Sequence, residues 1–150
     1  MAVLLVVHHT PSPATQELLE AALDGTRAEG IDGVEVRVRP ALGATASDVA
    51  EADGFLLGTP ANIGYMSGAL KVFFDAVYYP MLMAKVGAPY GLYVHGNNDV
   101  GGAVRAIESI ATGMGWTKVA EPVTITGPID KAVREAVWEL AATVAATIAG

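Results

Sequence analysis

Three short segments of the sequence carry most of the residue types that could bind a ligand. They are residues 8–15, 59–66 and 95–102, and each is rich in glycine, proline, asparagine, histidine or hydroxyl side chains. Hydroxyl and amide groups can both donate and accept hydrogen bonds. No convincing set of catalytic acid, base and nucleophile accompanies them, so the segments predict ligand binding rather than catalysis by side chains alone.

In the first segment, the hydroxyl side chains of Thr10, Ser12 and Thr15 meet at the predicted start of a helix. Unpaired N–H groups and the helix dipole give such a terminus affinity for phosphate. Because no lysine or arginine lies in the segment, hydroxyl groups and the dipole alone would hold a phosphate there. Two interpretations stay open: a phosphate site, or ordinary capping of the helix by Ser12 with Pro13 at its first position.

Two common nucleotide-binding motifs are absent. No Gly-x-Gly-x-x-Gly follows the first apolar run, which argues against a dinucleotide-binding Rossmann site. Gly96 and Gly101 have the spacing of a triphosphate-binding loop, but the required Lys-Ser/Thr does not follow them. A metal site is not expected either, because His8 and His9 would point to opposite faces of a strand.

The composition excludes several classes of function. The 150 residues have a formal net charge of −7 and include no cysteine. Disulfides, thiol catalysis and cysteine-bound metals are therefore excluded. An acidic chain without a basic cluster also lacks the positively charged surface that binds nucleic acid. Since neither a signal peptide nor a membrane span is evident, we expect one cytoplasmic domain over residues 1–150.

Short apolar runs alternate with amphipathic segments along the chain. The runs at 2–7, 34–38, 54–58, 89–94 and 119–126 predict strands, and the segments starting near 13, 47, 66, 101 and 129 predict helices. This alternation predicts an α/β fold: a doubly wound parallel sheet of five strands in the order 2-1-3-4-5, with helices on both faces. Ligands bind such sheets beyond the carboxyl ends of the strands, where all three segments should lie.

All three segments resemble those of a known family. Thr10–Thr15 is similar to the Thr-x-Thr-Gly-x-Thr phosphate loop of flavodoxins. The stretch from Gly58 to Lys71 resembles the Gly-Thr-Pro…Gly-x-Met-Ser-Gly…Leu-Lys stretch of FMN-dependent NAD(P)H oxidoreductases, which include the WrbA-like quinone reductases. Residues 95–102 are similar to the glycine-rich loop before the fourth helix of that group. The resemblance covers residues 2–126 and implies a flavodoxin-like fold.

This resemblance implies FMN as cofactor, with NAD(P)H and a small electron acceptor such as a quinone as partners. The first segment would wrap the FMN phosphate, and the other two would enclose the isoalloxazine ring, on which Tyr65 could stack. His95 could contact the ring, although the flavin itself does the chemistry. The implied binding residues are Thr10, Ser12, Pro13, Ala14, Thr15, Pro60, Ala61, Asn62, Ile63, Gly64, Tyr65, Met66, His95, Gly96, Asn97, Asn98 and Gly101.

The first segment departs from the flavodoxin pattern at two positions. Pro13 stands where flavodoxins have glycine and removes one N–H, and Ala14 lacks a polar side chain, so FMN binding could be weak. Two alternatives to a reductase therefore stay open: a flavodoxin-type electron carrier, which the acidic charge favours, and a flavodoxin-like module that has lost FMN and serves in binding. The apolar stretch Tyr78–Met83 predicts a homodimer or homotetramer, states that are common among the family's reductases.

Overall fold

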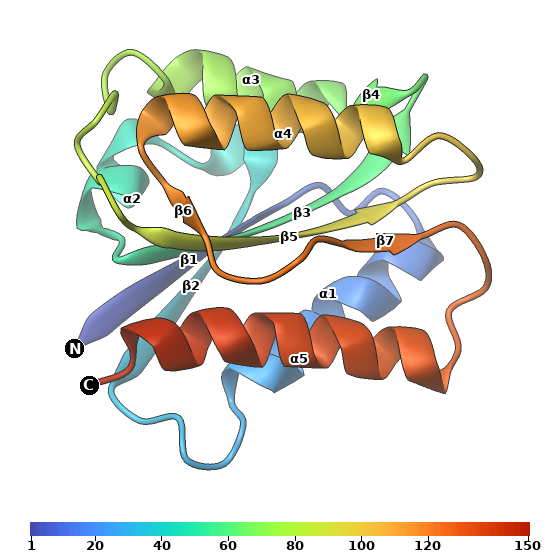
Figure 1. The fold of residues 1–150 in the computed structure, drawn as a ribbon, viewed down its shortest axis with the longest axis horizontal. Helices are drawn as coiled ribbons and strands as arrows, with labels where there is room; N and C mark the ends of the chain where they lie inside the picture. The colour runs from blue at the N-terminus through green and yellow to red at the C-terminus, as the bar shows by residue number, and fades with distance from the viewer.

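A parallel sheet forms the centre of the computed structural model, which describes all residues from Met1 to Gly150 (Figure 1). Its long strands are β1 (Ala2–His8), β2 (Val34–Pro40), β3 (Gly54–Asn62) and β5 (Pro89–His95). They lie in the order β2-β1-β3-β5, and the short strands β6 (Thr117–Lys118) and β7 (Val123–Ile125) both pair with β5 at the far edge. The predicted order of five parallel strands is therefore confirmed, with β6 and β7 together in the place of the fifth.

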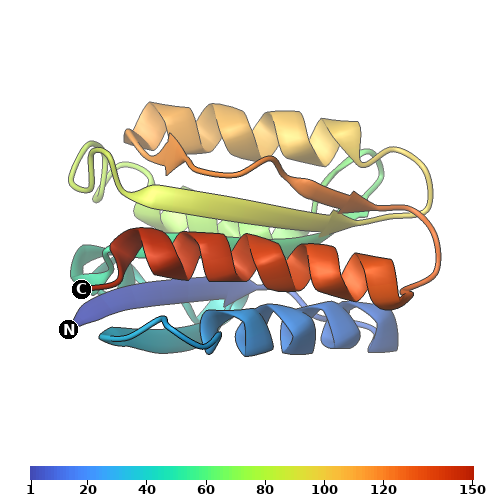
Figure 2. The same cartoon turned by 60° about the horizontal axis from the view of Figure 1, so that its bottom comes forward.

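Two layers of helices cover the sheet (Figure 2). Helices α1 (Pro13–Thr26) and α5 (Lys131–Ile148) pack on one face, and α2 (Ala46–Glu51), α3 (Gly68–Val77) and α4 (Gly101–Met114) pack on the other. A short 3₁₀ helix, η1 (Ala41–Gly43), follows β2. This is the predicted α/β arrangement with helices on both faces. None of the helices is both long and apolar enough to cross a lipid bilayer.

The apolar runs become strands because both faces of the sheet are buried. In β1, five consecutive residues from Val3 to Val7 are buried. Val3, Leu5 and Val7 enter the core under α3 and α4, while Leu4 and Val6 enter the core under α1 and α5. A continuous apolar run is what a parallel strand covered on both sides requires.

Several predicted boundaries move because of local hydrogen bonds. Helix α3 begins at Gly68 rather than at residue 66, since the Ser67 hydroxyl accepts the N–H of Leu70 at 3.2 Å. Helix α5 begins at Lys131 rather than at residue 129, since the Asp130 carboxylate accepts the N–H of Val133 at 2.9 Å. Both residues are N-caps, which fix the first turn of a helix.

The predicted strand at 119–126 is divided in the structure. Strand β6 ends at Lys118 and β7 begins at Val123, and the intervening residues include Pro122. Proline has no N–H with which to continue the ladder to β5, so the pairing resumes only beyond it. The apolar pattern of this region predicted a strand but not its interruption.

Candidate functional site

Strands β1, β3 and β5 end side by side at one edge of the sheet, on the right in Figure 1. The register pairs His8 with Gly58 and Pro60 with His95. Because the strands are parallel, the three segments predicted to bind a ligand leave the sheet at this same edge. The polypeptide connections from these strands to α1, α3 and α4 therefore form one surface.

The second segment lies between the strand predicted at 54–58 and the helix predicted to start near residue 66, and in the structure it is a β-hairpin. Strand β3 continues to Asn62, the chain turns through Ile63 and Gly64, and β4 (Tyr65–Met66) pairs back against β3. Both turn residues have positive φ, 52° for Ile63 and 71° for Gly64. Positive φ at both central positions is the pattern of a two-residue hairpin turn that matches the twist of its strands.

Two buried hydroxyl groups hold the base of this hairpin. The Oγ1 atom of Thr59 lies 2.8 Å from the carbonyl oxygen of Pro60 and 3.0 Å from Oγ of Ser67, and it accepts the N–H of Ser67 at 3.2 Å. Both side chains are almost completely buried. Since a buried polar group left without a partner is costly, this network fixes the hairpin to the start of α3.

The tip of the hairpin meets the first turn of α4 across two glycines. A Cβ atom on Gly102 would lie 1.9 Å from the carbonyl oxygen of Gly64, so only glycine allows this approach. A Cβ atom on Gly96 would lie 3.1 Å from that of Ala61, which brings the third segment close to β3 as well. The hairpin and the third segment are thus held together by backbone packing rather than by side chains.

Between them lies the edge cavity, a hollow of about 560 Å³. This volume is in the range of small-molecule sites. The lining is mostly small or amide side chains and exposed backbone, with a single carboxylate. The lining residues are Ala61, Asn62, Ile63, Gly64, Asn97, Asn98 and Asp99.

The first segment lies at the end of β1 and does not line the edge cavity. Ser12 caps α1: its Oγ accepts the N–H of Thr15 at 3.2 Å, and its own N–H donates to Oγ1 of Thr15 at 3.1 Å. The Thr10 hydroxyl lies 2.7 Å from Nδ1 of His8. Burial lowers the pKa of His8, and the adjacent His9 lowers it further, which favours the neutral ring in this contact.

A comparison with protein families shows to which family the chain belongs. The family described as NADPH-dependent FMN reductase matches residues 28–127, which is two thirds of the chain. The chain belongs to this family. The matched residues include the hairpin and the third segment but not Thr10–Thr15, the segment whose flavodoxin pattern is the weakest.

Individual proteins share part of the sequence or the fold of this chain. A flavodoxin of Aquifex aeolicus (strain VF5) is 38% identical over 77 residues, which are 51% of this chain and 40% of the relative. The match therefore spans less than half the length of that curated relative. A WrbA-like protein of Agrobacterium tumefaciens has a TM-score of 0.78 at 19% identity, covering 99% of this chain and 98% of that one. A Streptococcus pneumonia TIGR4 flavodoxin has a TM-score of 0.79 at 21% identity, covering 98% and 100%. These two likenesses confirm the predicted flavodoxin-like fold.

Six residues implied by the resemblance line the edge cavity of this family member: Ala61, Asn62, Ile63, Gly64, Asn97 and Asn98. Asp99 lines it too, although the resemblance does not imply a binding role for this residue. Its carboxylate accepts a long hydrogen bond of 3.4 Å from the N–H of Gly102. An acidic side chain just before a helix was the available signal, since such residues often hold the first N–H groups.

Other implied residues lie around the cavity rather than in it. Tyr65 is exposed on β4, beside the tip of the hairpin, and His95 is half-buried at the end of β5. The side chain of Met66 is buried in the core under α3 and α4, so only its backbone remains for a ligand. Gly101 lies in the first turn of α4.

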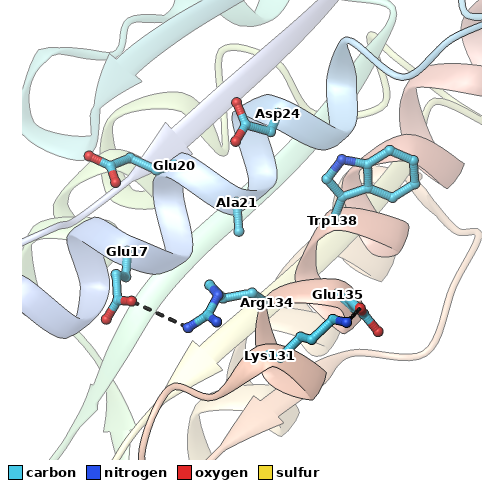
Figure 3. Close-up of a pocket in the computed structure, with 8 residues that line it drawn as sticks. All are labelled: Glu17, Glu20, Ala21, Asp24, Lys131, Arg134, Glu135 and Trp138. Carbon is cyan, nitrogen blue, oxygen red and sulfur yellow. Dashed lines mark ion pairs between the residues drawn. The ribbon is translucent and has the colours of Figure 1, made fainter.

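A second hollow of about 480 Å³ lies between α1 and α5 (Figure 3). We call it the helix hollow; its lining residues are Glu17, Glu20, Ala21, Asp24, Lys131, Arg134, Glu135 and Trp138. Several of the charges already pair, Arg134 with Glu17 at 3.6 Å and Lys131 with Glu135 at 3.8 Å. Its walls are helix surfaces rather than strand ends, and no residue of the three segments lines it.

Ile63 at the tip of the hairpin is the strained residue of the site. Its side chain is fully exposed, and a β-branched residue rarely adopts the positive φ of 52° that the turn imposes. We expect Ile63→Asn to raise the free energy of unfolding by about 1 kcal/mol, because asparagine tolerates this conformation. Urea or thermal denaturation of the two proteins measures the difference.

Leu42→Asn is the matched control, since Leu42 is also an exposed aliphatic side chain but is not among the residues with positive φ. This control should leave the stability close to that of the wild type. An Ile63→Asn protein no more stable than the wild type would show that the turn carries no strain.

Proposed function

We propose that the chain binds FMN at this edge of the sheet and uses it to oxidise NAD(P)H and reduce small acceptors such as quinones. The observation that carries the proposal is the edge cavity between the hairpin and the third segment, in a member of the NADPH-dependent FMN reductase family. Membership of the family supports oxidoreductase chemistry. The quinone rests on the resemblance of residues 58–71 to the quinone reductases.

The lining of the edge cavity fits a flavin ring. An isoalloxazine ring is flat and has hydrogen-bonding groups along its pyrimidine edge, so it needs close backbone and amide partners. Ala61 and Gly64 have little side chain to keep the backbone away from a ligand, and Asn97 and Asn98 each offer an amide donor and acceptor. Tyr65 is exposed beside the hairpin tip, and in this proposal it would cover one face of the ring.

The start of α1 fits the phosphate of FMN less tightly. The Thr15 hydroxyl donates to the carbonyl oxygen of Ser12 at 3.0 Å, so its only proton is engaged. The Ser12 hydroxyl, 2.9 Å from Oγ1 of Thr15, keeps a proton that it could give to a phosphate instead. Since residues 10–15 include no basic residue and the net charge is −7, we infer a weaker hold on the phosphate than on the ring.

When bound, FMN would supply the redox chemistry, the overall transfer of two electrons and two protons from NAD(P)H and solvent to the acceptor. The chain's residues orient the reactants. The hairpin and the third segment position the ring, and the Thr59–Ser67 network keeps the hairpin in place. His95, half-buried at the end of β5, can place an imidazole beside the ring and offset negative charge there.

A flavodoxin-type electron carrier is the second candidate. The 38% identity to the Aquifex aeolicus flavodoxin and the net charge of −7 favour it, since acidic surfaces steer docking to basic partners. Such a carrier would exchange electrons with proteins and would not react with NAD(P)H directly. The two candidates share the cofactor and the site, and they differ in the electron donor.

One experiment separates these functions. The full chain is incubated with FMN, passed through a desalting column, and mixed anaerobically with NADPH or NADH while the visible flavin absorbance is followed. We expect one equivalent of nicotinamide to bleach the bound flavin and one equivalent of a benzoquinone to restore it, because each transfer moves two electrons.

Dithionite is the control, since it reduces bound flavin without using a nicotinamide site. Flavin that dithionite bleaches but neither nicotinamide does would contradict the reductase and favour the carrier. A protein that leaves the column without flavin would contradict both and favour a module that serves in binding.

We also propose that the chain forms a homodimer through the apolar surface after α3. Tyr79, Leu82, Met83 and Val86 are all exposed there, and large exposed apolar groups in one segment mark interfaces. Light scattering should give the wild-type protein a mass of twice 15.4 kDa, and it should give Met83→Glu the mass of a single chain. Leu42→Glu, an exposed aliphatic residue elsewhere, should remain dimeric. A wild-type protein with the mass of one chain would contradict the dimer.

A further inference from the structure

Arg105, in the second turn of α4, has no acidic partner. Seven of the nine lysine and arginine residues form an ion pair within 4.0 Å, and only Lys85 and Arg105 do not. The acidic residue nearest along α4, Glu108, is held by Lys118 at 2.8 Å. In a chain with a net charge of −7, an arginine that forms no ion pair is therefore unusual.

The guanidinium of Arg105 folds back over the glycines that begin α4. A Cβ atom on Gly101 would lie 3.1 Å from its Nη1, and one on Gly102 would lie 3.8 Å from its Nη2. The same Cβ on Gly102 would clash with the carbonyl oxygen of Gly64 at the hairpin tip. The positive charge thus lies where α4 meets the hairpin, at the rim of the edge cavity.

The carboxylate closest to this position belongs to Asp99. Its Oδ1 would lie 3.6 Å from the same Cβ on Gly101, and it accepts the N–H of Gly102. Asp99 forms no ion pair with Arg105, so the planar fork of N–H donors in the Arg105 guanidinium remains available to a ligand. Such a fork matches the geometry of a phosphate, which it can bind through two parallel hydrogen bonds.

We propose that Arg105 binds a phosphate group of the nicotinamide coenzyme. This inference rests on the proposed function, because a coenzyme that reaches a ring in the edge cavity must pass its rim. NADH carries a pyrophosphate and NADPH carries a further 2′-phosphate, so either coenzyme brings negative charge towards an acidic protein. Arg105 is the one unpaired cation at that rim, and it would set the affinity for the coenzyme without taking part in electron transfer.

The test compares Arg105→Gln and Arg105→Lys with the wild-type protein loaded with FMN. Turnover gives KM and kcat for NADPH and for NADH, and calorimetry gives the Kd of NADP⁺ without turnover. For Arg105→Gln we expect KM and Kd to rise about tenfold, the usual effect of losing a charge-assisted hydrogen bond, with little change in kcat. For Arg105→Lys, KM and Kd should lie between those of the wild type and of Arg105→Gln, since lysine keeps the charge but lacks the paired N–H donors of a guanidinium.

Lys85→Gln is the matched control, because Lys85 is the other unpaired cation and lies by the start of β5, at the opposite edge of the sheet. It should change none of these constants, and FMN affinity should be equal in all variants. If the KM of Arg105→Gln rises for NADPH alone, Arg105 binds the 2′-phosphate. If it rises equally for NADH, Arg105 binds the pyrophosphate. Both results support the inference. Unchanged KM and Kd in Arg105→Gln would overturn it, as would a wild-type protein that binds no NADP⁺. Loss of turnover with intact, Arg105-dependent NADP⁺ binding would instead contradict only the reductase.

Discussion

The site depends on one close contact, that of Gly102 in α4 with the carbonyl oxygen of Gly64 at the hairpin tip. A Cβ atom on Gly102 would lie 1.9 Å from that oxygen, so the first turn of α4 can meet the hairpin only if residue 102 is glycine. The contact closes one side of the edge cavity and brings Asp99 and Arg105 to its rim. The parallel register of β1, β3 and β5 brings the three segments together, because it ends these strands at the same edge of the sheet.

The charges of the proposed FMN site divide it into a part for the flavin ring, the ring region, and a part for the phosphate, the phosphate region. The ring region uses backbone groups and asparagine amides, which attract polar edges without carrying charge. The phosphate region has hydroxyl groups that largely satisfy one another, and the chain as a whole repels an anion. Arg105 is the exception to this pattern, because it is a positive charge without an ion pair and lies at the rim rather than within residues 10–15.

The sequence predicted the fold well, because a strand buried on both faces must be a continuous apolar run, as Val3–Val7 shows. It did not predict the hairpin, since Ile63-Gly64 lacks the usual Asn-Gly signal of a two-residue turn. It left open whether Ser12 caps α1, and the structure shows that it does. Asp99 and Arg105 were missed because their position depends on how α4 packs against the hairpin, a contact between residues far apart in the sequence.

We propose that FMN binds at the strand ends, in the edge cavity, and not in the helix hollow. Titration of the ¹⁵N-labelled chain with FMN, followed by amide chemical shifts, tests this most directly. We expect the signals of residues 61–64 and 97–99 to shift most, those of residues 10–15 to shift less, and the indole N–H signal of Trp138 to stay in place. Shifts centred on Trp138 and its neighbours in α1 and α5, with the hairpin unchanged, would contradict it.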